Sequence, residues 1–201
     1  NELGWGGYWA WDPVENSSLF PWLISTALLH VLLLPSHNRF KKVWSYVLIV
    51  LTYTLTIFAT FLTRSGILDS VHAFAGGILG QIFCALLVII AVFCLALGWF
   101  KRQVLFASHT EPSQRTQGLS AAEKAIMAGS ALLLLLCAGV LFGTMFPVLT
   151  RTFAMREVVL DASFFNQLSV PLFLGLISLM SITPLLPSKA TGAKKSATRL
   201  V

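Results

Sequence analysis

Residues 77–100 read GILGQIFCALLVIIAVFCLALGWF, a run of 24 residues without a charged side chain. A helix needs about 20 consecutive apolar residues to cross the hydrocarbon core of a bilayer. Four more uncharged apolar windows flank this run, at residues 18–34, 43–62, 125–149 and 164–186. The 201-residue chain is only 11% charged, whereas soluble domains carry about 25% charged residues. We therefore predict an all-α, polytopic membrane helix bundle with about five transmembrane helices.

The windows divide the chain into three regions. Residues 18–187 form the predicted transmembrane region, and residues 188–201 form a basic tail. Residues 1–17 precede the first window and carry a tryptophan-rich segment. Neither a methionine nor a signal peptide opens the chain, so we expect it to be part of a longer protein. The three cysteines fall inside apolar windows without CxxC spacing, which indicates free thiols rather than a metal cluster or disulfides.

The basic residues predict which loops share a side of the membrane. Eleven of the 14 Lys and Arg residues lie in the 35–42 and 101–124 loops and in the tail, against three in the 63–76 and 150–163 loops. Basic loops stay in the cytoplasm or its organellar equivalent. The tryptophan-rich segment is therefore predicted on the outer face, with the two poorly charged loops. Because the basic residues are spread over three segments, they do not form a nucleic-acid-binding face.

The tryptophan-rich segment, LGWGGYWAWDP at residues 3–13, holds three tryptophans, a tyrosine and three glycines. Tryptophan and tyrosine gather at membrane interfaces, so an aromatic belt is one interpretation. A belt, however, scatters its aromatics over helix ends, whereas these crowd into glycine-rich chain. The other interpretation is a surface for a large planar apolar ligand, and composition leaves both open.

Two carboxylates close this segment. Asp12 is placed to be the N-cap of a helix, with Pro13 at its first position and Glu15 reaching back to the cap. Two nearby carboxylates could instead serve acid–base catalysis. Capping explains both without a further assumption.

Two glycines in the fourth window predict a close helix contact. Gly139 and Gly143 are four residues apart, the small-xxx-small spacing that lets membrane helices approach one another. The signal is weak, because glycine is common in membrane helices.

One histidine lies inside a predicted span. An ionisable residue within a membrane segment is a functional hypothesis by default, and His30 lies in the first window. Trp22, Thr26 and His30 are spaced four apart, so they share one helix face, which can look into a bundle. The imidazole could hydrogen-bond across helices or bind haem iron.

The other histidines lie in loops. His72, in RSGILDSVHAFAGG, is on the predicted side of the tryptophans. It is either an exposed loop residue or an axial haem ligand. His37 and His109 lie in charged loops on the opposite side, and we assign them no function.

Four stretches together resemble a known family: WGGYWAWDPVENSSLFPWLISTALLH at 5–30, FLTRSGILDSVHAFA at 61–75, GTMFPV at 143–148 and SFFN at 163–166. The first resembles the WWD signature of the haem-handling membrane proteins of cytochrome c maturation, the CcmF, CcmC and CcsA group. With the others it is similar to the CcmF family, the membrane subunit of the bacterial-type (system I) cytochrome c haem lyase. The resemblance runs from Leu3 to about Phe165.

The resemblance implies two haem b sites. The outer haem is held by the WWD segment, whose matching residues are Trp5, Trp9, Trp11 and Asp12. His72 then corresponds to an axial ligand of this outer haem iron. His30 corresponds to a ligand of a second, permanent haem b within the membrane. Arg64, at the outer end of the second span, either pairs with a haem propionate or anchors the helix at the interface.

The implied function is covalent attachment of haem to the CxxCH segment of an apocytochrome c through thioethers, by a multi-subunit haem lyase (holocytochrome c synthase). No catalytic residue is assigned, because the chemistry belongs to the cofactor and the substrate thiols. The implied partners are the haem chaperone CcmE, a CcmH-type thiol subunit, apocytochrome c and the remainder of a CcmF polypeptide. The alternatives are a haem transporter that loads the chaperone without joining haem to protein, and a structural segment without a cofactor.

Two departures from the family pattern limit the resemblance. Ala10 stands where relatives carry a bulky aromatic. The partner histidine of each haem lies outside the region represented, so we expect one ligand per haem and no activity from this stretch alone. A truncated sequence and a family member divided into separate polypeptides both fit. The location is a bacterial or a mitochondrial inner membrane, with the WWD segment in the periplasm or the intermembrane space.

Overall fold

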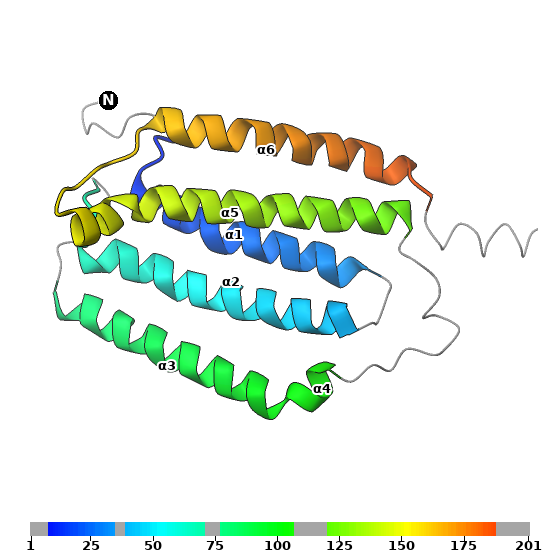
Figure 1. The fold of residues 1–201 in the computed structure, drawn as a ribbon, viewed down its shortest axis with the longest axis horizontal. Helices are drawn as coiled ribbons and strands as arrows, with labels where there is room; N and C mark the ends of the chain where they lie inside the picture. The colour runs from blue at the N-terminus through cyan, green and yellow to red at the C-terminus, as the bar shows by residue number, and fades with distance from the viewer. Residues whose placement is uncertain (1–7, 35–38, 71–76, 107–119, 188–201) are drawn as a thin grey trace, which may run out of the picture.

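The computed structural model describes residues 8–34, 39–70, 77–106 and 120–187, and all regular structure in these ranges is helical (Figure 1). Five helices are long and apolar enough to cross a membrane, which confirms the predicted fold class. The elements are α1 (Pro13–Leu33), α2 (Arg39–Ser65), α3 (Ile78–Phe100), the short α4 (Arg102–Phe106), α5 (Ala121–Ala154), α6 (Ala162–Ile182) and a 3-10 turn η2 (Thr183–Leu185).

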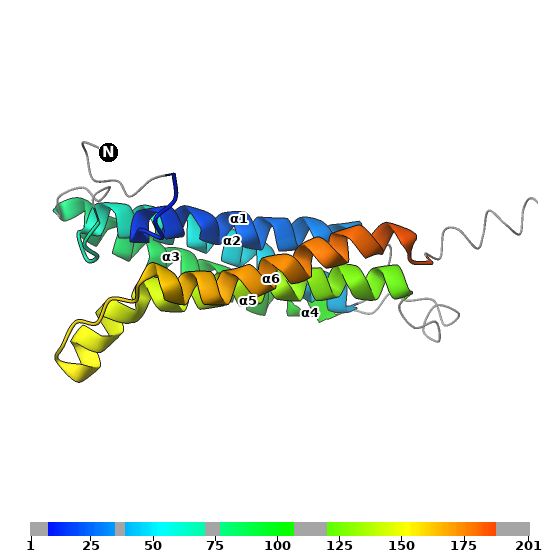
Figure 2. The ribbon, with the colours of Figure 1, turned by 90° about the horizontal axis from the view of Figure 1, so that it is seen from above.

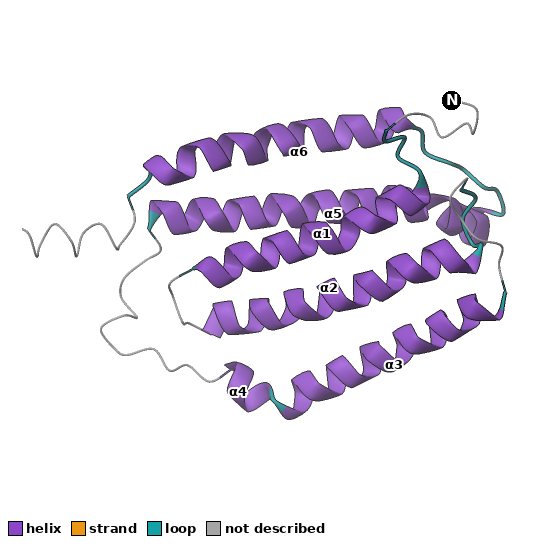
Figure 3. Cartoon of the chain, turned by 180° about the vertical axis from the view of Figure 1, so that it is seen from behind, coloured by secondary structure: helices purple, strands orange, loops and turns teal. Residues whose placement is uncertain are grey.

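The long helices lie side by side in the order α3, α2, α1, α5, α6, so the chain starts in the middle of the row (Figures 1 and 3). Helix α1 packs between α2 and α5, while α3 and α6 each pack against a single long neighbour. Accordingly, 39% of the apolar window is buried in α1 and α5, against 11% in each of the other three. The row is open, and most of α3 and α6 is exposed.

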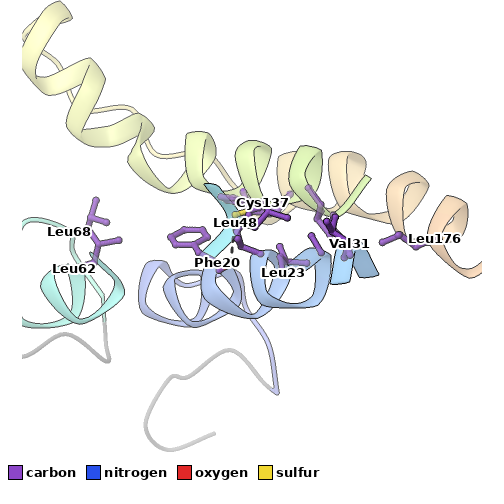
Figure 4. Close-up of a cluster of buried hydrophobic side chains, with 14 residues drawn as sticks. Phe20, Leu23, Val31, Leu48, Leu62, Leu68, Cys137 and Leu176 are labelled. Carbon is purple, nitrogen blue, oxygen red and sulfur yellow. Dashed lines mark hydrogen bonds between the residues drawn. The ribbon is translucent and has the colours of Figure 1, made fainter. Parts of the chain in front are cut away.

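The core lies where α1 meets α2 and α5 (Figure 4). Its fully buried side chains include Phe20, Leu23 and Ala27 of α1, Leu48 of α2, and Leu136 and Val140 of α5. Cys137 is buried in the same cluster, with its Sγ 3.8 Å from the carbonyl oxygen of Phe20. It is a free thiol, as are Cys84 and Cys94.

Helix α5 is longer than its apolar window because its start is capped. Ser120 Oγ accepts from the backbone N–H of Glu123 at 3.3 Å, and Glu123 Oε2 accepts from the N–H of Ser120 at 2.7 Å. The 34 residues give a length of about 51 Å, well beyond the roughly 30 Å of a hydrocarbon core. Pro147 lies inside the helix, and Figure 2 shows the yellow end of α5 turning away from the row. A proline removes one backbone hydrogen bond and kinks a helix.

The predicted close contact at the two glycines is confirmed. A Cβ on Gly143 would lie 2.7 Å from Cε1 of both Phe164 and Phe165 of α6. A Cβ on Gly139 would lie 2.4 Å from Leu168 Cδ2. Both distances are below van der Waals contact, so glycine is what allows α6 to approach α5 here.

One end of the row gathers the segments predicted to share a face. Residues 8–12, 66–70 and 155–161 all lie at the end where α1, α3 and α6 begin and α2 and α5 finish (Figure 1). We call it the WWD end. The compartment that it faces stays a prediction.

Candidate functional site

The carboxylates at the start of α1 form the predicted capping box. Asp12 Oδ1 accepts from the backbone N–H of Val14 at 2.8 Å, and Glu15 Oε2 accepts from the N–H of Asp12 at 3.2 Å. Glu15 also accepts from the N–H of Ala10 at 2.9 Å, so it holds the chain one turn upstream. Ser70 Oγ donates to Asp12 Oδ1 at 2.7 Å, which ties the loop after α2 to the cap. The two acids therefore fix the end of the tryptophan segment.

Trp11 is docked on the start of α6. Its indole Nε1–H donates to Asn166 Oδ1 at 2.8 Å. Its ring stacks on Phe165 with centroids 5.2 Å apart and planes 13° from parallel. Trp9 meets Trp11 edge-on, with centroids at 5.9 Å and planes at 88°. One face of Trp11 is thus covered by protein, and the two indoles form a corner.

The backbone of Trp11 is strained. Its φ is 59°, in the left-handed region that a bulky side chain rarely adopts. Such a conformation costs about 1–3 kcal/mol and persists only where the surroundings over-determine it; it is typical of ligand clamps and active sites. Here the surroundings include Asn16, whose Nδ2 donates to the carbonyl oxygen of Trp11 at 3.0 Å.

Asn16 joins the segment to α5. It is fully buried, and its Nδ2 also donates to Thr144 Oγ1 at 3.1 Å. Within the described ranges no donor reaches its Oδ1. A buried, half-satisfied amide is expensive in a membrane protein, so its position between Trp11 and Thr144 indicates a role in holding the tryptophan segment.

Sequence reasoning did not select the residues that hold Trp11. Phe165 and Asn166 appeared only inside the SFFN stretch, and no spacing rule connects them with a residue 155 positions away. Asn16 and Thr144 are separated by 128 positions. Both lie in stretches that resemble the family, and each is a polar side chain within or next to an apolar window, the criterion that selected His30.

The Asn166 contact can be tested with a matched pair of variants. Asn166→Leu removes the acceptor for Trp11, whereas Asn166→Asp keeps an oxygen there. A net hydrogen bond contributes about 1 kcal/mol, so we expect the leucine variant to open residues 8–16 about fivefold more often. Hydrogen–deuterium exchange of that peptide measures the effect. Equal exchange in both variants would show that the bond does not hold the segment.

His30 presents one ring nitrogen for a further contact. Its Nδ1 lies 2.7 Å from the carbonyl oxygen of Thr26. Because a carbonyl oxygen can only accept, Nδ1 is the donor in this contact, and in the neutral imidazole Nε2 is then the acceptor. A metal-binding histidine commonly donates its other N–H to a backbone carbonyl in this way. The ring is partly buried.

The face that carries His30 is open within this row. Trp22, Thr26 and His30 lie along one side of α1, as predicted, but Trp22 is 54% exposed. Among the described helices, the buried face of α1 is the one with Phe20 and Leu23, whereas Thr26 and His30 are only partly buried.

The remaining predicted site residues lie at the WWD end or outside the described ranges. Arg64 is partly buried in the last turn of α2, where a positive charge suits the helix dipole. Trp5 and His72 fall outside the described residues. In sequence His72 follows Ser70, the residue bonded to Asp12, by two positions.

Known proteins are similar to this chain in sequence and in fold. A family model described as "Cytochrome C assembly protein" matches residues 1–68. The chain is 41% identical over 191 residues to the cytochrome c-type biogenesis protein CycK of Bradyrhizobium diazoefficiens, covering 94% of the chain and 28% of CycK. It is 36% identical over 186 residues to CcmF of Escherichia coli, covering 92% of the chain and 28% of that protein. The solved structure of "Cytochrome c Heme Lyase CcmF" matches with a TM-score of 0.63 at 31% identity, over 93% of this chain and 26% of that one.

The chain is of the CcmF type. It is an integral membrane protein related to proteins of cytochrome c biogenesis, and it spans between a quarter and a third of the length of the relatives named above. The matches extend well beyond the residues of the family model. The matched regions cover 92–94% of the chain, so they cannot end at α2. The similarity therefore also includes α5 and α6, which pack around the tryptophan segment.

Proposed function

We propose that this CcmF-type chain holds haem at its WWD end for covalent attachment to an apocytochrome c, as part of a multi-subunit cytochrome c haem lyase. The observation that carries the proposal is the fixing of Trp11 in a strained conformation by Asn16, Phe165 and Asn166. An interfacial belt needs no such bracing, whereas a platform for a rigid planar ligand must itself be rigid.

Exposed aromatic side chains at the corner formed by Trp9 and Trp11 support a planar ligand such as a porphyrin. Tyr8 is fully exposed and Trp9 is 38% exposed, while Phe165 supports the far side of Trp11. Aromatic faces and edges bind a planar apolar ring by stacking and edge contacts. On this proposal Trp5 completes the surface, and Asp12 contributes by holding the segment rather than by touching the haem.

The substrate haem needs an axial nitrogen near the platform. We assign this role to His72, because Ser70 of the same loop is hydrogen-bonded to Asp12 at the foot of the tryptophan segment. Arg64, in the last turn of the helix that leads into this loop, is assigned to a haem propionate.

His30 is assigned to a resident haem b within the membrane. The residue fits, because Nδ1 is engaged by the carbonyl of Thr26 and Nε2 is the nitrogen left to bind iron. When bound, this group would supply the electron that keeps the substrate iron reduced. The chain contributes one ligand, and the second comes from the remainder of a CcmF polypeptide.

In the proposed reaction, each of two substrate thiols adds across one haem vinyl group. A C–S bond and a C–H bond form, and the S–H bond and the vinyl double bond are lost. The chain binds and orients the haem while CcmE delivers it and a CcmH-type subunit presents the reduced thiols. The location follows as the bacterial or mitochondrial inner membrane, with the WWD end outward.

The experiment is to replace His72 by alanine in the complete CcmF-type protein. Loss of an axial ligand should reduce retained outer haem by at least about tenfold, since even outer-shell partners of a metal ligand cost about 10- to 100-fold. His109→Ala is the control, because it removes a histidine from a loop on the predicted opposite side. A reduced-minus-oxidised absorption spectrum measures the haem.

A second assay separates attachment from transport. Wild-type protein in its complete assembly is given haem and a CxxCH apoprotein, and thioether formation is followed. Haem retained without thioether formation would favour a haem-presenting transporter. Unchanged haem content in His72→Ala would refute the outer-site assignment.

A further inference from the structure

A groove between α2 and α3 lies toward the end opposite the tryptophan segment. It is bounded on α2 by residues from Val43 to Thr54, on α3 by residues from Ala91 to Trp99, and at its end by Arg102, Leu105 and Phe106 of α4. Its volume is about 660 Å³, within the roughly 300–1,000 Å³ of small-molecule sites. Nothing in the proposed haem-handling function uses it.

The length of the groove matches one leaflet. The lining residues of α3 run from Ala91 to Trp99, and Arg102 follows at the start of α4. Those of α2 run from Val43 to Thr54, which is 11 residue steps. At 1.5 Å per residue this is about 16 Å, and half of a hydrocarbon core is about 15 Å. Because the lining begins four residues after the start of α2 and ends in α4, next to the basic 35–42 and 101–124 loops, we place the groove in the leaflet on the basic-loop side.

Gly98 of α3 makes room for a tyrosine side chain of α2 in the groove wall. Gly98 lets the ring of Tyr46 lie directly against the helix, since a Cβ there would be 3.1 Å from the tyrosine oxygen. The Tyr46 hydroxyl donates to the carbonyl oxygen of Cys94 and is thereby satisfied. With Tyr46 engaged, the lining suits a hydrocarbon chain along its length.

Among the described residues that line the groove, Arg102 is the one charged side chain, and it lies at the end next to the basic 101–124 loop. The Arg102 guanidinium lies 4.4 Å from the ring centroid of Trp99, and its Nη1 donates to the carbonyl oxygen of Trp99 at 3.3 Å. Arginine has five N–H donors, so this bond leaves several for an anion. Basic pockets between membrane helices on the cytoplasmic or matrix side bind anionic lipid headgroups.

We propose that the α2–α3 groove binds one acyl chain of an anionic phospholipid of the basic-loop leaflet, with the lipid phosphate on Arg102. The charge at the mouth, the apolar lining and the one-leaflet length together specify this occupant. Another helix of the protein would bury the groove without needing an anion at Arg102.

The first test measures lipid charge selectivity. The complete CcmF-type protein in detergent is titrated with phosphatidylglycerol and with phosphatidylcholine of the same chains, and bound lipids are counted by native mass spectrometry. We expect tighter binding of phosphatidylglycerol, and about a fivefold loss of that binding in Arg102→Gln, as expected for one basic residue at an anionic surface. Lys101→Gln is the control, because it removes the same charge from an exposed neighbour outside the groove.

The second test fills the groove. Ala91→Phe places a ring in the apolar part, and we expect it to displace one bound lipid. Val92→Phe adds a ring at a neighbouring position that is 61% exposed and outside the lining. We expect this control variant to keep the bound lipid. Equal lipid counts in both variants and the wild type, or equal loss in Arg102→Gln and Lys101→Gln, would overturn the proposal.

Discussion

Replacing His30 by alanine is expected to remove the haem b absorbance of the membrane region from the complete CcmF-type protein. The reason is chemical: Nε2 is the ring nitrogen that the helix leaves available, because Nδ1 is bound to the carbonyl of Thr26. Loss of the ligand should weaken haem binding by at least about 10- to 100-fold, the cost of removing a mere outer-shell partner. A reduced-minus-oxidised spectrum of the purified protein measures it.

Thr26→Val is the matched control for His30→Ala. It changes the same face one turn away but leaves the backbone carbonyl that orients the imidazole, since the threonine hydroxyl donates to Trp22 instead, at 2.7 Å. We expect the valine variant to keep its haem. The amount of haem retained at the outer site is measured on the same samples. Normal retention there shows that the His30→Ala protein is still folded. A normal haem b spectrum in a folded His30→Ala protein would refute the ligand assignment.

Local chemistry explains what the sequence could predict. The run at 77–100 is too long and too apolar for a soluble helix, and the structure has α3 over nearly the same residues. The capping box of Asp12 and Glu15 involves residues three apart, so its geometry follows from the helix itself. The pair of Gly139 and Gly143 predicted a close contact, although not which helix would make it.

Long-range packing explains what the sequence could not predict. The sequence predicts Trp11 as a platform residue but does not predict that its ring stacks on Phe165 and that its N–H is bonded to Asn166. Neither contact follows from a period of 3.6 residues, because α6 reaches Trp11 only after the chain has crossed the row. The openness of the His30 face has the same origin, since helix spacing places residues on a face but does not say which neighbour covers it.

The fold therefore makes the tryptophan segment dependent on α6. Phe165 lies between Gly143 of α5 and the ring of Trp11, touching the first and stacking on the second. A displacement of α6 would remove the support of Trp11 without changing any residue of the tryptophan segment. This dependence can be tested at Gly143 of α5, which lies outside the tryptophan segment.

Gly143→Ala is expected to destabilise the protein and to loosen the tryptophan segment. The added methyl would lie 2.7 Å from aromatic carbons of both Phe164 and Phe165, so α6 must move. Overpacking of this kind costs about 1–3 kcal/mol. We expect a lower thermal midpoint in detergent and faster hydrogen–deuterium exchange in residues 8–16, with less haem retained at the WWD end.

Gly129→Ala makes the same chemical change in the same helix and should act in the opposite direction. Gly129 is buried, but a Cβ there would meet nothing within 4 Å. Replacing a mid-helix glycine by alanine without a clash stabilises a helix by about 0.5–1 kcal/mol. If the two variants had equal midpoints and equal exchange in residues 8–16, the contact between Gly143 and Phe165 would not be what supports Trp11. A lower midpoint with unchanged exchange in Gly143→Ala would show that α6 is packed there but does not hold the tryptophan segment.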